Sequence, residues 1–347
     1  MLKYWHTRSA FFGLLLLLSA GDLSACVSVA QAVDPVVNGT NDSSSVPNYR
    51  SNVSEARVTF FATDENNHAI VTLTKSDFAV VDSERVLRNF RSFMHSDETS
   101  LDVVVMVDLS ESVAPRVRAA IGDVLRLVAR EQSIPDDNIS VLSFGGTPAR
   151  TLGGSVGGLT PAILCTSGCR VSDSLASLLA VKSGGSTPLF DAVIFGADFV
   201  SQHRRVGGRD NVRPVLILFS DGYDTISLHS ASEALQAAQD AGALIYSVDM
   251  GKTDRGKAEN SSLGNIFLRQ ISDATGGRYF SLSPRFSQED AAEVLNAVLG
   301  DLRASYVVTY DLPSHEPGFH SLRLLPTHNL NLTFHSRSGY DYKPSDR

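Results

Sequence analysis

The chain has 347 residues, enough for one large domain with an appendage or for two domains. It is 43% hydrophobic and 20% charged, which is ordinary for a soluble globular protein. The formal net charge of -8 and the lack of a basic cluster argue against a nucleic-acid partner.

The N-terminus has the pattern of an export signal rather than of a folded element. Lys3 and Arg8 form a basic start, and residues 11–20 form an apolar run that is too short to span a bilayer stably. We therefore expect an exported protein, located in the periplasm or at the cell surface.

Two processing sites compete in this region. An ordinary signal peptide covers residues 1–32 and ends on the small-x-small pattern Ala-Gln-Ala. A lipoprotein signal covers residues 1–25, because the sequence LSAC is similar to the lipobox of bacterial lipoproteins, in which the cysteine, here Cys26, is lipidated. In that case the N-terminal lipid is the only membrane contact that we expect.

The chain contains three cysteines, and in an oxidising compartment an odd count leaves one thiol over. If Cys26 is lipidated or removed, Cys165 and Cys169 can form a disulfide within the sequence CTSGC. The rival interpretation is a two-thiolate metal site, which the lack of other cysteines and of a nearby histidine disfavours.

Residues 33–54 are rich in Asn, Ser, Pro and Gly and are predicted to be a flexible linker. Residues 55–97 contain short β-rich runs between polar turns, which is typical of an antiparallel sheet. The strands are predicted at 57–63, 69–73, 77–81 and 85–91. So short a segment can hardly bury a core alone, so it needs a partner.

Residues 98–303 alternate between strands and helices, which predicts a doubly wound α/β domain with a mostly parallel, Rossmann-like sheet. The strands are predicted at 101–107, 138–144, 214–219, 244–248 and 278–282. The helices are predicted at 113–131, 172–181, 188–203, 231–241, 262–275 and 288–302.

Residues 304–343 return to strands, predicted at 305–310, 320–325 and 331–334. Together with residues 55–97 they supply enough strands for one antiparallel β-sandwich. We therefore predict that the two flanking segments form one small β domain, with the α/β domain inserted between them.

Polar residues follow the apolar run at 101–107. Asp108, Ser110 and Ser112 place one carboxylate and two hydroxyls in a tight turn at the carboxyl end of a buried strand, where open α/β sheets bind ligands. All three are hard oxygen donors of the kind that Mg²⁺, Mn²⁺ or Ca²⁺ prefers. Taken alone, Asp108 is equally well explained as the cap of a helix.

Two further loops complete the pattern: Thr187 lies in a Gly-rich turn before a helix, and Asp221 follows the strand at 214–219. This set resembles the metal-ion-dependent adhesion site of von Willebrand factor A domains. The resemblance implies that five residues form the metal site, namely Asp108, Ser110, Ser112, Thr187 and Asp221. It also implies bound Mg²⁺ or Mn²⁺, and a protein partner whose acidic side chain completes the metal's ligand shell.

The resemblance can be narrowed. The sequence LTKSDFAV at residues 73–80, Asn89-Phe90, and the segment from Tyr306 to Tyr340 are similar to the exported "VWFA-related" family described from Acidobacteria. Members of that family carry the A domain between β segments.

Two other acidic residues lie near the predicted metal site in sequence. We expect Asp191 in the first turn of a helix and Asp224 in a solvated loop.

Two other functions are less consistent with the sequence. A metal-dependent, phosphatase-like hydrolase is disfavoured, because the phosphoryl-accepting Asp needs a second Asp two residues on, where this chain has Ser110. The sequence also has no nucleophile elbow, P-loop or zinc-binding His pattern. A cation-independent envelope scaffold is disfavoured by the complete donor set. The sequence thus predicts a divalent-cation-dependent protein-binding or adhesion module and not an enzyme.

Overall fold

The structure is a computed structural model that describes residues 55–114, 116, 122, 138–145, 161–166, 183–207, 212–251, 263–281 and 288–343. The export signal, the linker, Cys26, Cys169 and the predicted helix at 172–181 lie outside the described residues, as does most of the predicted helix at 113–131. Within the described part of the chain, no helix combines the length and apolar character needed to cross a membrane.

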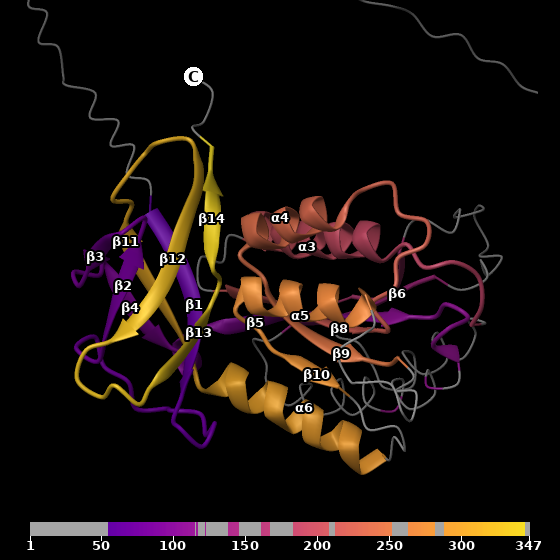
Figure 1. Cartoon of the computed structure of the whole chain (residues 1–347), viewed down its shortest axis with the longest axis horizontal. Helices are drawn as coiled ribbons and strands as arrows, with labels where there is room; N and C mark the ends of the chain where they lie inside the picture. Colours follow the sequence, from indigo (N-terminus) through magenta and orange to yellow (C-terminus); the bar gives the residue numbers. More distant parts are fainter. Residues whose placement is uncertain are drawn as a thin grey trace, which may run out of the picture. The chain divides into compact units, whose positions relative to one another are not determined.

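A six-stranded sheet forms the centre of the α/β part of the chain (Figure 1). Its strands are β5 (Ser100–Asp108), β6 (Asn138–Phe144), β7 (Ala162–Cys165), β8 (Val212–Ser220), β9 (Leu244–Asp249) and β10 (Tyr279–Ser281). Their order is β10-β9-β8-β5-β6-β7, and only β7 runs antiparallel to its neighbour. Strand β5 therefore lies between β8 and β6 in the interior of the sheet.

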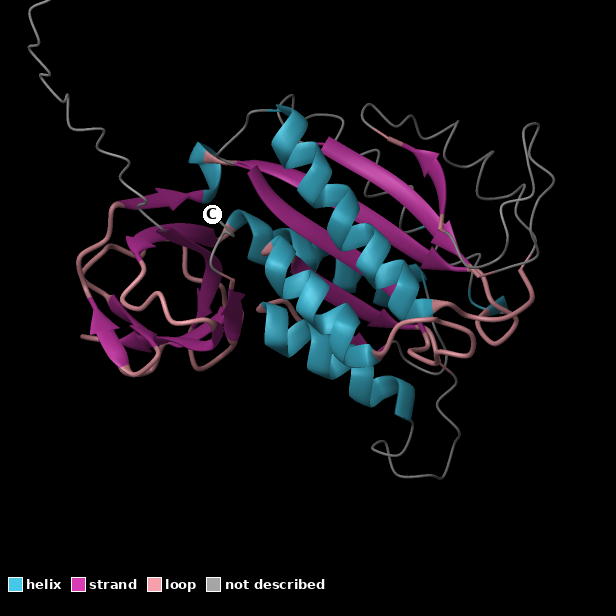
Figure 2. Cartoon of the chain, turned by 90° about the horizontal axis from the view of Figure 1, so that it is seen from above, coloured by secondary structure: helices cyan, strands magenta, loops and turns pink. Residues whose placement is uncertain are grey.

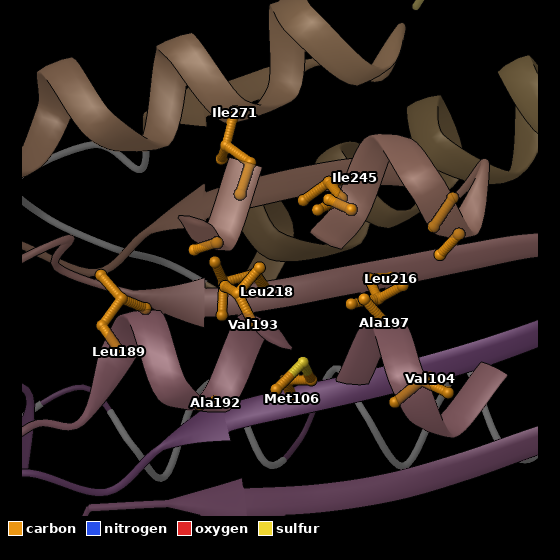
Figure 3. Close-up of a cluster of buried hydrophobic side chains, with 14 of the residues drawn as sticks. Val104, Met106, Leu189, Ala192, Val193, Ala197, Leu216, Leu218, Ile245 and Ile271 are labelled. Carbon is orange, nitrogen blue, oxygen red and sulfur yellow. The ribbon is translucent and has the colours of Figure 1, made fainter. Parts of the chain in front are cut away.

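Helices cover both faces of this sheet, which explains why β5 is apolar along its whole length. They are α3 (Leu189–Gly207), α4 (Ala231–Ala241), α5 (Leu263–Thr275) and α6 (Gln288–Arg303). Val103, Val105 and Val107 pack in one cluster with α6, whereas Val104 and Met106 pack in the other with α3, α4 and α5 (Figure 3). Figure 2 shows the helices, in cyan, lying along the strands of the sheet.

Two four-stranded antiparallel sheets form the remainder. One has the order β13-β1-β11-β4 and the other β14-β12-β2-β3. Their strands are β1 (Glu55–Thr63), β2 (Phe78–Asp82), β3 (Arg85–Leu87), β4 (Ser92–His95), β11 (Ser305–Asp311), β12 (Gly318–Pro326), β13 (Thr333–Ser336) and β14 (Gly339–Tyr342). One apolar core joins side chains of both sheets, including Phe60, Phe78, Tyr306 and Leu322. Such a core between two sheets makes a β-sandwich.

Both sheets pair strands from opposite ends of the chain. Strand β1 pairs with β11, with Phe60 opposite Tyr306, and β2 pairs with β12, with Val80 opposite Leu324. The predicted fold class is therefore confirmed: a mostly parallel α/β sheet with an antiparallel β-sandwich formed by the flanking segments. The domain limits at 55–97, 98–303 and 304–343 stay a prediction.

A buried arginine secures the two crossings between the sandwich and the α/β part. The chain leaves the sandwich after β4 through a short 3₁₀ helix, η1 (Ser96–Glu98), and returns from α6 into β11. The guanidinium of Arg213 on β8 donates to the carbonyls of Leu302 at 2.6 Å and Ser96 at 3.2 Å, and to the hydroxyl of Ser305. One side chain thus contacts both crossing segments.

The predicted strand at 69–73 is wrong. Only Ala69 makes a bridge, to Thr63, and the backbone groups that follow find another partner. The hydroxyl of Tyr306 donates to the carbonyl of Ile70 at 2.9 Å and accepts from the amide of Leu73 at 3.1 Å. A side chain therefore satisfies groups that a strand would have paired.

The other differences concern strand limits. The predicted strand at 85–91 ends at Leu87, as β3, because the chain then passes to the other sheet, where it forms β4. The predicted strand at 331–334 begins two residues later as β13. Strands β4, β7 and β14 were not predicted; they have only four residues each, too few for a clear alternation.

A matched pair of glycine substitutions tests the packing around β9. A Cβ added at Gly277 would lie 2.1 Å from the carbonyl oxygen of Ile245, whereas at the exposed helical Gly300 it would meet nothing within 4 Å. Gly277→Ala is expected to lower the free energy of unfolding by about 1–3 kcal/mol through overpacking. Gly300→Ala is expected to raise it by about 0.5–1 kcal/mol through helix propensity.

Urea denaturation followed by circular dichroism measures both changes. Equal stability of the two variants would contradict the close approach of Gly277 to β9.

Candidate metal centre

Three segments that carry the predicted site residues meet at the carboxyl edge of the central sheet. Asp108 ends β5, and the adjacent parallel strand β8 ends at Ser220, directly before Asp221. Because Val107 pairs with Phe219, the next residues of the two strands also lie side by side. Accordingly, the Ser220 hydroxyl donates to Oδ2 of Asp108 at 2.7 Å.

The turn after β5 folds its donors toward one another. The backbone amide of Ser110 donates to Oδ1 of Asp108 at 2.9 Å, and the hydroxyl oxygens of Ser110 and Ser112 lie 3.2 Å apart. Asp108 is fully buried and Ser110 nearly so, whereas Ser112 is exposed. The donors thus run from the interior to the surface.

Backbone hydrogen bonds join this turn to the Gly-rich turn before α3. The amide of Gly184 donates to the carbonyl of Leu109 at 2.9 Å, and the amide of Glu111 donates to the carbonyl of Gly185 at 3.4 Å. Gly145, after β6, lies beside this turn and has a φ of +68°. A Cβ there would lie 3.1 Å from the Ser110 amide nitrogen and 3.4 Å from Oδ1 of Asp108, so the position favours glycine.

Thr187 and Asp221 are also buried, with 3% and 4% of their surface exposed. Oδ1 of Asp221 accepts the amide of Tyr223 at 3.2 Å. The backbone amide and carbonyl of Thr187 both bond Thr225, in the loop that follows Asp221.

The electrostatics favour a cation at this point. Burial raises the pKa of Asp108 from 3.8 to about 6, against the hydrogen bonds from Ser110 and Ser220, and the negative charge of Asp221 raises it further. Among the described residues, no Lys, Arg or His forms an ion pair with either carboxylate. Buried charge without a counter-ion is unfavourable, so a cation fits here.

The donor types narrow the kind of cation. No group of three or more His, Cys, Asp and Glu side chains in the described ranges is arranged to hold a metal ion, so a zinc-type site is not found there. Two carboxylates with hydroxyl oxygens suit a hard cation such as Mg²⁺, which keeps several waters when protein ligands are few. The residues present therefore fit the predicted Mg²⁺, with Mn²⁺ or Ca²⁺ as alternatives.

Sequence reasoning missed two polar residues beside this centre, Ser220 and Asp249. Asp249 ends β9 opposite Ser220, and its carboxylate accepts the hydroxyl of Tyr279 and the amide of Gly251, both at 2.6 Å. Burial raises the pKa of Asp249, and the charge of Asp221 adds to the effect. The signal was present, because Asp249 follows an apolar strand just as Asp108 does.

Two further acids, Asp191 and Asp224, lie near this centre, and only one of the two predictions made for them holds. Asp191 lies in the first turn of α3, as predicted. The prediction of a solvated loop for Asp224 is wrong, because its carboxylate is half-buried and accepts the amide of Phe190 at the start of α3, at 3.2 Å. A carboxylate is favourable at this position, because the amides of the first helical turn have no partner within the helix.

Cys165 lies at the end of β7. Because Cys169 lies outside the described residues, its disulfide with Cys165 stays a prediction.

Removing the Asp108 charge is expected to stabilise the metal-free protein. At pH 8 the carboxylate is charged in both the folded and the unfolded chain. A pKa raised from 3.8 to about 6 in the fold means that this charge lowers the free energy of unfolding at that pH. We expect Asp108→Asn to raise it by about 1–3 kcal/mol in EDTA at pH 8, measured by urea denaturation.

The matched control is Asp97→Asn on the exposed part of η1, for which we expect no change beyond about 0.5 kcal/mol. A less stable Asp108→Asn protein in EDTA would contradict the unfavourable burial of the charge.

Comparisons with known proteins found several solved structures that are similar to this chain. Solved structures similar to this chain include manganese-loaded Plasmodium vivax TRAP protein, with 14% identity and a TM-score of 0.41 over 77% of this chain and 100% of that chain. Proximal thread matrix protein 1 from the mussel byssus has 14% identity and a TM-score of 0.40, over 61% of this chain and 48% of its own.

A third similar structure is the pilus adhesin SpaC from Lactobacillus rhamnosus GG, with 11% identity and a TM-score of 0.42 over 81% of this chain and 47% of that chain. Identities and TM-scores this low carry no argument about fold or function. No curated protein matches the chain in sequence.

The family is shown by sequence. The family described as von Willebrand factor type A domain matches residues 102–293, which is more than half of the 347 residues. The match begins within β5, just before Asp108, and ends within α6. This chain therefore belongs to the von Willebrand factor type A domain family.

Proposed function

We propose that this protein is an exported binding module that recognises an acidic side chain of a protein partner through a divalent metal ion. The observation that carries the proposal is the buried carboxylate of Asp108, which lies beside Asp221 and has no cationic partner in the described ranges. The proposed site is the metal-ion-dependent adhesion site of the family, in the subgroup similar to the exported "VWFA-related" proteins.

Five residues would hold the metal: Asp108, Ser110, Ser112, Thr187 and Asp221. Bound there, Mg²⁺ would act as a Lewis acid that accepts a carboxylate oxygen from the partner. Because the three hydroxyl ligands are neutral, only two protein charges balance the ion, and it keeps affinity for an outside carboxylate. The exposure of Ser112 gives the partner a route of approach.

The surface next to Asp221 favours a protein over a small ion as the partner. Tyr223, Ile226 and Leu228 in the following loop expose 44%, 44% and 80% of their surface. Large apolar side chains exposed together beside a polar site are typical of protein-binding surfaces. Such side chains can surround a partner's acidic residue with apolar contacts.

The alternatives are less consistent with the geometry. A phosphatase-like hydrolase would use Asp108 as the phosphoryl acceptor, but this carboxylate is fully buried and already accepts two hydrogen bonds. A cation-independent scaffold leaves the buried charge of Asp108 without a counter-ion. We therefore propose binding rather than catalysis. The proposal includes export, with Cys26 as the lipid attachment point if the lipoprotein signal is used.

A peptide array tests the proposed recognition. The purified protein is applied to peptides with a central Asp or Glu and to the same peptides with Asn or Gln, in Mg²⁺ and in EDTA. Binding is expected only to acidic peptides and only in Mg²⁺. Asp108→Ala is expected to abolish it, whereas the exposed Asp97→Ala is expected to leave it unchanged.

Calorimetric titration with Mg²⁺ on the same samples separates the two parts of the proposal. If the wild-type protein takes up no Mg²⁺, Mn²⁺ or Ca²⁺, the metal site is wrong. If it binds metal but retains amide peptides as well as acidic ones, the recognition of a carboxylate is wrong.

A further inference from the structure

The loop that follows Asp221 is bonded directly to the backbone of Thr187. The amide of Thr187 donates to the hydroxyl of Thr225 at 2.7 Å, and the amide of Thr225 donates to the carbonyl of Thr187 at 2.9 Å. The two residues thus form a closed ring of hydrogen bonds. It joins the segment that carries one proposed ligand to the segment that carries another.

The same loop supplies the caps of α3. The amide of Phe190 donates to Oδ2 of Asp224 at 3.2 Å, and the amide of Asp191 donates to the hydroxyl of Ser227 at 3.1 Å. Amides of the first helical turn normally need a capping side chain from the residue before the helix. Asp224 and Ser227 take this role, because the residue directly before α3 is Pro188, whose side chain has no acceptor.

A third set of bonds secures the far end of the loop. The carboxylate of Asp191 accepts the amide of Leu228 at 3.0 Å and the amide of His229 at 3.1 Å. It also lies 2.7 Å from Nδ1 of His229. The loop is therefore attached to the start of α3 on both sides of Thr225.

We propose that Thr225 is a positioning residue, which holds the backbone of Thr187 so that its hydroxyl faces the metal; this rests on the proposed function. Thr225 itself is exposed and does not belong to the proposed ligand set. Its hydroxyl is required because the amide of the buried Thr187 needs an acceptor. A ligand that is fixed before the metal arrives binds it more tightly than one that must be ordered.

Substitutions that remove or keep the hydroxyl test the proposal. Thr225→Val preserves the branched shape and removes the acceptor, Thr225→Ala removes both, and Thr225→Ser keeps the hydroxyl. The dissociation constant for Mg²⁺ is measured by calorimetry and the melting temperature in EDTA by circular dichroism. Thr333→Val on the exposed part of β13 is the matched control.

We expect Thr225→Val and Thr225→Ala to weaken Mg²⁺ binding by about 10-fold or more, as for other residues that orient metal ligands. Their melting temperatures in EDTA should fall by only about 2–4 °C, the effect of one lost hydrogen bond. Thr225→Ser and Thr333→Val should bind Mg²⁺ like the wild type.

Wild-type Mg²⁺ affinity in Thr225→Val or Thr225→Ala would overturn the positioning role while leaving the proposed function intact. So would a folded Thr225→Ser protein that binds Mg²⁺ as weakly as Thr225→Val. A wild-type protein that binds no Mg²⁺ would instead overturn the proposed function, and this inference with it.

Discussion

The carboxylate of Asp108 lies at the end of a strand that helices cover on both faces, and burial holds its pKa near 6. Water cannot compensate its charge there, so the loops around it must. Ser220 and the amide of Ser110 donate to it, and Gly145 leaves the space open. The arrangement of three loops around one buried charge is therefore the feature on which the proposed chemistry depends.

The β-sandwich is joined by hydrogen bonds to the α/β part of the chain, which carries this charge. Arg213 bonds both crossing segments, and the amide of Ser338 donates to the carbonyl of Ala274 at the end of α5, at 2.9 Å. On the opposite side of the sheet from α3, the guanidinium of Arg278 pairs with the carboxylate of Asp301 on α6 at 2.7 Å. These polar contacts attach α5 and α6 to the sandwich and to the sheet.

Hydrophobic periodicity was sufficient to predict the long helices and strands. The apolar run of β5 and the spacing of apolar residues in α4 are compatible with few other structures. It predicted a strand wrongly at residues 69–73. There the backbone bonds the hydroxyl of the distant Tyr306 instead of a neighbouring strand. The proposed donor set could be assembled from sequence because each member follows a strand or precedes a helix. The ring between Thr187 and Thr225 was not, since its partners are 38 residues apart and neither residue type demands the other.

Crystals of the protein soaked with Mn²⁺ and measured at the manganese absorption edge give the most direct test of the metal centre. The account predicts one anomalous peak at the carboxyl end of β5, with the hydroxyl oxygens of Ser110, Ser112 and Thr187 about 2.1 Å from it. Crystals of Asp108→Ala should lack that peak. An empty site in the wild-type protein, or a peak bound elsewhere and retained in the variant, would contradict the account.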